Sequence, residues 1–340
     1  MLMARRLPIP DRPVVVVTGA SAGVGRAVVR RFAQDGARIA LIARGRDGLE
    51  AAAREVEQAG GQALVLALDV SDADAVEDAA SRVEERFGPI DIWINAAFAG
   101  VLAPFMDTKA EDYRRVTDVT YHGQVNGTRA ALRRMLPRGR GSIVLVGSAL
   151  AYRGIPLQAA YCGAKHAIQG FQDSIRAELD HVGSAIHVAM VQLPGVNTPQ
   201  FDWIRTTMPN RPKPASPPYQ PEIAARAIHY AAHHRRKSLW VALPSAKAIL
   251  GDRLASPLLD RYLGATGFRG QQGAEPVSPD RQDNLWQPVP GDHGAHGRFD
   301  AQARRHSIWL ELSTRPRLSA SMIGAAAALA AGLLFRRKKG

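Results

Sequence analysis

Three side chains in the middle of the chain have the types and spacing that proton transfer requires. Tyr161 and Lys165 are four residues apart, so a helix would place them on one face, and twelve residues separate Ser148 from Tyr161. An ammonium group near a phenol favours the phenolate and brings the pKa of the phenol closer to neutral pH. A serine hydroxyl beside them would bind the same substrate oxygen and stabilise its charge. The alternative is a core tyrosine followed by an exposed lysine.

A glycine-rich segment near the start of the chain could bind a phosphate group. Gly19, Gly23 and Gly25 lie between the β-branched run 14–17 and a stretch with helical spacing. Glycines allow a sharp turn and let backbone N–H groups approach a pyrophosphate, and the helix N-terminus adds a favourable dipole. A tight turn between a strand and a helix is the alternative. The residues of this segment predicted to bind the nucleotide cofactor are Thr18, Gly19, Ser21, Ala22, Gly23, Val24 and Gly25.

The charge that follows the second apolar run, 38–43, indicates which dinucleotide would bind. A site for NAD(H) needs an acidic residue there to bind the ribose hydroxyls, but the chain continues Arg44-Gly45-Arg46. Arg44 is instead well placed to pair with a 2′-phosphate, which predicts NADP(H) in preference to NAD(H). A solvated loop arginine is the alternative.

The elements that must position these residues alternate between strands and helices. Apolar runs typical of buried strands alternate with stretches of helical spacing, which predicts an α/β fold of the doubly wound, Rossmann type with a parallel sheet. We expect a single domain of this kind with a C-terminal extension. The expected strands are 14–17, 38–43, 63–68, 90–94, 142–146, 185–193 and 239–243, and the expected helices are 27–34, 48–58, 73–87 and 221–234.

Composition divides the chain into an N-terminal arm (1–12), a catalytic domain (13–250), a loop-rich extension (251–318) and an apolar helix with a basic tail (319–340). The stretch 320–335 has no charge and precedes four basic residues. As a helix it would reach about 24 Å, short of the ~30 Å hydrocarbon core of a bilayer. It is therefore interpreted as a short anchor, an interfacial helix, or a buried helix at a dimer contact.

Charge and cysteine content exclude several classes of site. The chain has 44 Lys and Arg against 31 Asp and Glu, but its arginines are dispersed and no nucleic-acid motif accompanies them, so no nucleic-acid partner is expected. The single cysteine, Cys162, rules out an internal disulfide. His229 and His233 have a spacing that can bind metal, but no carboxylate completes a set, so a solvated basic face and no metal site are expected.

The glycine segment and the Ser148, Tyr161 and Lys165 spacing together resemble the short-chain dehydrogenase/reductase family, over about 14–198. The resemblance implies hydride transfer between a nicotinamide cofactor and a carbonyl or alcohol, with Tyr161 as general acid or base assisted by Ser148 and Lys165. It also implies that Tyr161 and Lys165 contact the cofactor. Further cofactor-binding positions implied by the resemblance are Asp69, Val70, Asn95, Ala96, Pro194, Gly195, Val196 and Thr198.

Two of these family positions have plain structural alternatives. Asp69 could instead cap a helix near Ser71, and the Pro194-Gly195 pair could be a simple proline turn after a strand.

The chain departs from the family pattern at two places. The usual Asn-Asn-Ala-Gly reads Asn95-Ala96-Ala97-Phe98, and Thr120 stands where the family has a catalytic asparagine that supports a water-linked proton relay. We expect Thr120 to hold a water less firmly, which lowers the rate rather than changing the reaction class. The alternative function is therefore a weak or inactive NADP-binding scaffold attached to a membrane.

The substrate, the assembly and the location follow from weaker features. Residues 209–219, preceded by Phe201 and Trp203, lie where the family has a lid, and the aromatic residues predict a small apolar substrate. A rigid proline-rich spacer is the alternative. The resemblance implies a homo-oligomer. No signal-peptide pattern precedes the first strand, so we expect a cytoplasmic protein, with membrane contact through 320–339 as the open alternative.

Overall fold

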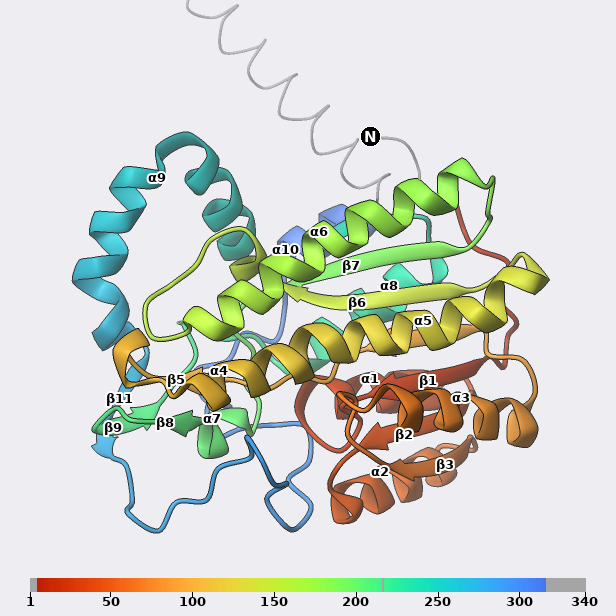
Figure 1. Ribbon diagram of the computed structural model, residues 1–340, viewed down its shortest axis with the longest axis horizontal. Helices are drawn as coiled ribbons and strands as arrows, with labels where there is room; N and C mark the ends of the chain where they lie inside the picture. The colour runs from red at the N-terminus through yellow and green to blue at the C-terminus, as the bar shows by residue number, and fades with distance from the viewer. Residues whose placement is uncertain (1–4, 216, 316–340) are drawn as a thin grey trace, which may run out of the picture.

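A seven-stranded parallel sheet forms the centre of the computed structural model, which describes residues 5–215 and 217–315 (Figure 1). The strand order is β10-β7-β6-β4-β1-β2-β3, so the direction of winding reverses between β1 and β4. This confirms the predicted doubly wound fold. The strands are β1 (Val14–Thr18), β2 (Arg38–Ala43), β3 (Gln62–Ala67), β4 (Ile92–Asn95), β6 (Ser142–Ser148), β7 (His187–Leu193) and β10 (Ser238–Trp240).

Both faces of the sheet are covered by helices, because alternate side chains of each strand point to opposite faces. In β1, Val15 and Val17 pack with one set of helices, and Val14 and Val16 pack with the other. All four valines are fully buried, which explains the unbroken apolar run. The first face is covered by α1 (Gly23–Ala33), α2 (Arg46–Gln58) and α8 (Pro221–His233), and the second by α3 (Ala73–Phe87), α4 (Ala110–Thr117), α5 (Gly123–Met135) and α6 (Ala159–His181).

Short elements lie between the main ones. Two small sheets form outside the central one, where β5 (Val101–Leu102) pairs with β8 (Arg205–Thr206) and β9 (Asn210–Pro212) pairs with β11 (Gln272–Pro276). The remaining short helices are η1 (Phe105–Asp107), η2 (Asp118–His122), η3 (Leu136–Arg138), η4 (Ala149–Ala151) and α7 (Gln200–Trp203).

The chain after the central sheet differs from the sequence expectation. The sequence predicts a strand at 239–243 and loops from 251 onward, but the strand β10 ends at Trp240 and α9 (Leu243–Gly270) follows. The helix is kinked at Ala255, before Pro257, and both Leu254 and Leu258 are exposed. Because its apolar residues do not follow one buried stripe, the pattern does not indicate a helix.

The rest of the extension returns to the domain. In Figure 1 the blue chain leaves β11, passes below α7 towards α1 and α2, and ends in α10 (Ile308–Thr314) beside β10. Ser307 caps α10 through its hydroxyl, which accepts a hydrogen bond from the backbone N–H of Leu310. The tail 319–340, expected as an apolar helix, lies outside the described residues. Within 5–215 and 217–315, no helix is long and apolar enough to span a bilayer.

Candidate active site

A cavity of about 440 Å³ opens at the carboxyl ends of the central strands, where the winding of the sheet reverses. Parallel α/β sheets bind their ligands in such a crevice. The glycine segment after β1 and the end of β6 line it together, so the phosphate-binding and proton-transfer residues expected from the sequence meet at one site.

The glycines of the segment allow a close approach of backbone to backbone. Gly19 has φ +71°, and a Cβ added there would lie 2.9 Å from the backbone of Ala97. A Cβ on Gly25 would lie 2.0 Å from the carbonyl oxygen of Gly19. The N-cap residue of α1, Ala22, has no side chain that caps the helix. The N–H of Gly23 donates to the carbonyl oxygen of Gly294, but no side chain of the N-cap covers the helix N–H groups that follow. The segment therefore fits a dinucleotide pyrophosphate.

Thr18 holds the segment after β4, which lines the cavity, in place. Its hydroxyl accepts hydrogen bonds from the backbone N–H groups of Ala96 and Ala97, at 3.0 and 3.1 Å. Thr18 thus ties the end of β1 to the segment after β4, and Ala96 lines the cavity. Asn95 is fully buried, and its amide donates to Thr128 Oγ1 while its Oδ1 accepts from Trp93 Nε1. Asn95 therefore stabilises β4, and its side chain is engaged with protein groups.

Ser148, Tyr161 and Lys165 all line the cavity. Ser148 is the last residue of β6, and its Oγ accepts a hydrogen bond from the backbone N–H of Leu150. Tyr161 and Lys165 lie on the first turns of α6, where Lys165 Nζ is 5.5 Å from the centre of the Tyr161 ring. The lysine is 2% exposed and donates to the carbonyl oxygen of Val146 at 2.6 Å.

Burial shifts both titrating groups of this cluster away from their charged forms. Desolvation raises the pKa of Tyr161, and a hydrogen bond with Ser148 only partly opposes that shift. Desolvation lowers the pKa of Lys165 to about 7. In the cofactor-free protein the pKa of Tyr161 therefore moves away from neutral, because burial outweighs the hydrogen bond with Ser148. At neutral pH the phenol keeps its proton and can donate it.

Thr120 has a different environment from the one expected. It lies in η2, a single π-helical turn that separates α4 from α5. Its hydroxyl donates to the carbonyl oxygen of Ala99 and accepts from the N–H of the same residue, both at 3.0 Å. The hydroxyl proton is therefore engaged with backbone, and Thr120 fixes the segment beside the cavity.

Basic side chains gather at the far end of the cavity, where the adenosine of a dinucleotide would lie. Asp69 forms an ion pair with Arg115, which together with hydrogen bonds from Ser71 holds the pKa of its carboxyl low against desolvation. Asp69 is not a helix cap, because Asp72 caps α3. Arg44 lines the cavity, and burial and the nearby Arg115 lower the pKa of its guanidinium.

The opposite end is formed by the segment after β7. Pro194, Gly195, Val196 and Thr198 line the cavity, as the family resemblance implies. Sequence reasoning missed Asn197, which is fully buried and donates from Nδ2 to Gln220 and Asp300 while its Oδ1 accepts from the N–H of Phe299. It also missed the extension, which contributes Asn284, Pro288, Val289, Gly291 and His293 to the lining.

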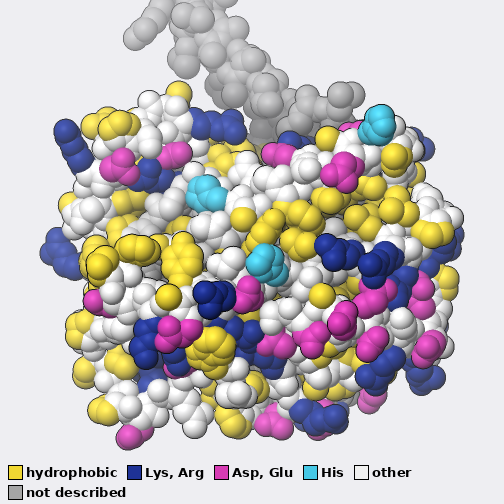
Figure 2. Space-filling view, in the orientation of Figure 1, with side chains coloured by type: hydrophobic (Ala, Val, Ile, Leu, Met, Phe, Trp, Pro, Cys, Tyr) yellow, Lys and Arg dark blue, Asp and Glu magenta, His cyan; other side chains and the backbone are white. Residues whose placement is uncertain are grey.

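The described residues hold no group of three or more His, Cys, Asp or Glu that could bind a metal ion. His229 is mostly buried against Phe32 and lies 2.6 Å from Asp35, so the solvated face expected for the α8 histidines is wrong at this position. On the face shown in Figure 2, Lys and Arg side chains are interspersed with Asp and Glu, so the net positive charge does not form a single patch there.

Comparisons with known proteins agree with this geometry. The protein-family model for short chain dehydrogenases matches residues 13–208. The chain is 29% identical to the uncharacterized oxidoreductase YxnA of Bacillus subtilis, over 94% of this chain and 90% of that protein.

Two solved structures are similar to this fold. An alcohol dehydrogenase from Thermococcus sibiricus, complexed with 5-hydroxy-NADP, has a TM-score of 0.59 and 27% identity over 67% of this chain and 95% of its own. A metagenomic short-chain oxidoreductase in complex with NADP has a TM-score of 0.55 and 28% identity over 65% of this chain and 90% of its own. With the family model matching more than half of its length, this chain belongs to the short-chain dehydrogenase/reductase family.

Proposed function

We propose that this protein is an NADP(H)-dependent oxidoreductase that interconverts a carbonyl and an alcohol. The observation that carries the proposal is that Ser148, Tyr161 and Lys165 line the same cavity as the glycine segment of α1. A hydride donor held by the glycine segment would therefore lie beside a phenol that can supply a proton. When bound, the nicotinamide would give or accept the hydride at the substrate carbon.

Side chains of this protein would transfer the proton and bind the substrate and the cofactor. Tyr161 donates its proton to the carbonyl oxygen during reduction and takes it back during oxidation, and the Ser148 hydroxyl binds the same oxygen. Burial keeps the phenol protonated at neutral pH, which favours its role as a donor. Lys165 is buried beside the Tyr161 ring, where it would bind cofactor hydroxyls.

Two guanidinium groups support a preference for NADP(H). Arg44 and Arg115 both donate to the carbonyl oxygen of Leu285, each at 3.1 Å, and Asp69 is the carboxylate paired with Arg115. The excess positive charge favours a 2′-phosphate over a bare ribose hydroxyl pair. Both similar solved structures contain NADP or an NADP analogue. Arg44 also contacts residues 284–286, which would affect both cofactors, so Arg44→Ser is expected to weaken NADPH binding about tenfold more than NADH binding.

The other half of the cavity favours an apolar substrate. Aromatic and aliphatic side chains line it, among them Phe98, Leu102, Leu150, Ile155, Phe201, Trp203 and Ile204. We therefore infer a small carbonyl compound or alcohol whose reactive group is bound by Ser148 and Tyr161 and whose remainder is held by apolar contacts. A homo-oligomer and a cytoplasmic location stay predictions.

The experiment is a screen for NADPH oxidation with ketones, aldehydes and quinones, run in parallel with Tyr161→Phe. Turnover by the wild type, lost in Tyr161→Phe with NADPH binding retained, supports the proposal. Tight NADPH binding without turnover across the panel would favour the scaffold alternative. Equal turnover by the two proteins would refute the role of the phenol.

A further inference from the structure

Residues 284–294 of the C-terminal extension, here called the strap, cross the cofactor half of the cavity. Asn284, Pro288, Val289, Gly291 and His293 all contribute to its lining. In Figure 1 this blue segment runs between α7 and the helices α1 and α2 that follow the first two strands. The strap therefore lies over a site that the central domain otherwise forms alone.

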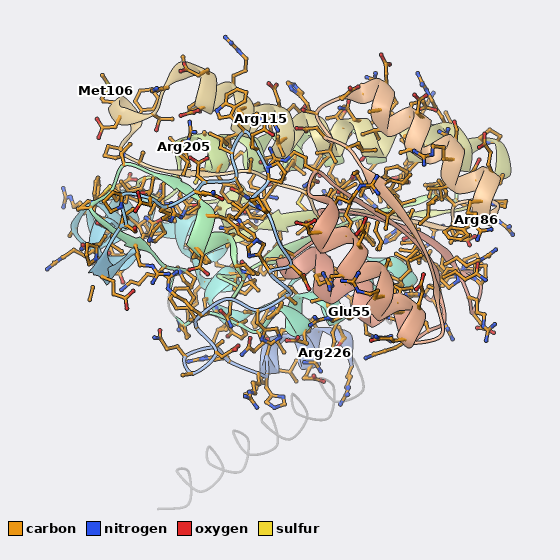
Figure 3. All side chains as sticks on the ribbon, turned by 90° about the horizontal axis from the view of Figure 1, so that it is seen from below. Glu55, Arg86, Met106, Arg115, Arg205 and Arg226 are labelled. Atoms are coloured by element: carbon orange, nitrogen blue, oxygen red, sulfur yellow. The ribbon has the colours of Figure 1, made fainter. Side chains whose placement is uncertain are left out.

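The first end of the strap is fixed at the basic end of the cavity. The Arg44 guanidinium donates to three successive carbonyl oxygens, those of Asn284, Leu285 (3.1 Å) and Trp286 (2.9 Å). Arg115, labelled in Figure 3, donates from Nε to the same Leu285 oxygen and lies 5.6 Å from the centre of the Trp286 ring. Trp286 Nε1 donates to Asp112 at 2.9 Å.

The second end is fixed at the glycine segment. Gly294 accepts a hydrogen bond from the N–H of Gly23, the first residue of α1, at 3.0 Å. Asp292 lies 3.2 Å from Arg26, a guanidinium that is 1% exposed, and the N–H of Gly291 donates to Asp47 of α2 at 2.8 Å. These three anchors lie on α1 and α2, and each is a polar contact.

The strap also contacts the substrate side. The N–H of Asn284 donates to the carbonyl oxygen of Trp203, and the ring of His293 is 4.5 Å from the ring of Trp203. Trp203 ends α7 and lines the cavity. The position of the strap is therefore linked to α7, whose Trp203 lines the cavity.

We propose that the strap closes the dinucleotide site over its adenosine and pyrophosphate half, so that the cofactor leaves only when the strap opens. The inference rests on the proposed function. Leu285 is fully buried in the core on the α3–α6 face and therefore stays fixed. Residues 286–294 are held by hydrogen bonds and an ion pair, which open at a smaller cost than a packed apolar interface. Trp286 and Asp292 act as positioning residues, since each holds the strap without lining the cavity itself.

The test is the rate at which bound NADPH dissociates, followed by nicotinamide fluorescence after mixing with excess NADP⁺. The variant Trp286→Ala/Asp292→Asn removes one anchor at each end. The matched control is Trp309→Ala, which deletes a tryptophan of the same extension that packs on Trp240, away from the cavity. Because each anchor involves a charged partner, we expect about a tenfold or larger increase in the dissociation rate for the anchor variant and none for the control.

Thermal unfolding of both variants separates a loose strap from a damaged fold. A faster rate at a midpoint close to that of the control supports the proposal. Equal dissociation rates in the wild type, the anchor variant and the control overturn the strap and leave the proposed function standing. A wild type that binds neither NADPH nor NADH overturns the proposed function, and the strap with it.

Discussion

The buried Lys165 should make the stability of the cofactor-free protein depend on pH in a way that one substitution removes. Its folded-state pKa is about 7, against an ordinary value of 10.5, because burial disfavours the charged form. Between these two values the unfolded chain binds more protons than the folded protein. The free energy of unfolding must therefore rise with pH in this window, and the effect is lost as pH falls towards 7.

The magnitude follows from the same two pKa values. A full difference of one proton changes the free energy of unfolding by about 1.4 kcal/mol per pH unit. Near pH 7 the folded lysine is half protonated, so the gain between about pH 7 and pH 9 is roughly 2 kcal/mol. Lys165→Met cannot titrate, so the wild type should gain this amount relative to the variant over that interval.

Chemical denaturation at several pH values, without cofactor, measures the difference. The control is Lys237→Met, which removes an exposed lysine paired with Asp173 on the surface. The difference between the wild type and this control should stay nearly flat. A constant difference between the wild type and Lys165→Met from pH 7 to pH 9 would show that the lysine is not desolvated as the structure requires.

Three further substitutions test the local geometry. Gly25→Ala places a Cβ 2.0 Å from the Gly19 oxygen and should abolish NADPH binding. The control is Gly170→Ala, at an open position on α6, which should bind NADPH normally. Calorimetric titration of both variants with NADPH measures the difference. Gly127→Ala forces a Cβ to within 2.2 Å of Asn95 Oδ1 and should lower the free energy of unfolding by about 1–3 kcal/mol, measured by denaturant titration. Asn197→Ala removes the partner of the N–H of Phe299 and of the Oε1 of Gln220 and should cost roughly 2–3 kcal/mol, while an unchanged unfolding midpoint would contradict its anchoring role.

Much of the central domain could be predicted from local pattern. The run 14–17 is fully buried on both faces of the sheet, so it contains no polar alternation and indicates a parallel strand. Tyr161 and Lys165 share a face because α6 is regular where they occur, and their spacing alone predicts this. The sequence therefore locates the candidate site where strand and helix ends are set by short-range patterns.

Other features depend on contacts that no local pattern encodes. Arg44 meets carbonyl groups about 240 residues further along the chain, and the strap that supplies them has no helical or strand periodicity. The hydrogen bonds of Thr120 depend on the π turn of η2, which shifts the helix register at that residue. The direction of the pKa shift of Tyr161 depends on its burial, which spacing does not reveal.

The central proposal is that Tyr161 protonates a carbonyl oxygen beside the glycine segment, where a bound nicotinamide would supply hydride to the carbon. Its most direct test is a single-turnover reaction with NADPH deuterated at the transferring ring position, in which the alcohol product is analysed by mass spectrometry. The account predicts one deuterium on the carbinol carbon with the wild type, and no labelled alcohol with Tyr161→Phe that still binds NADPH. Unlabelled product from the wild type, or equal labelling by the variant, would contradict it.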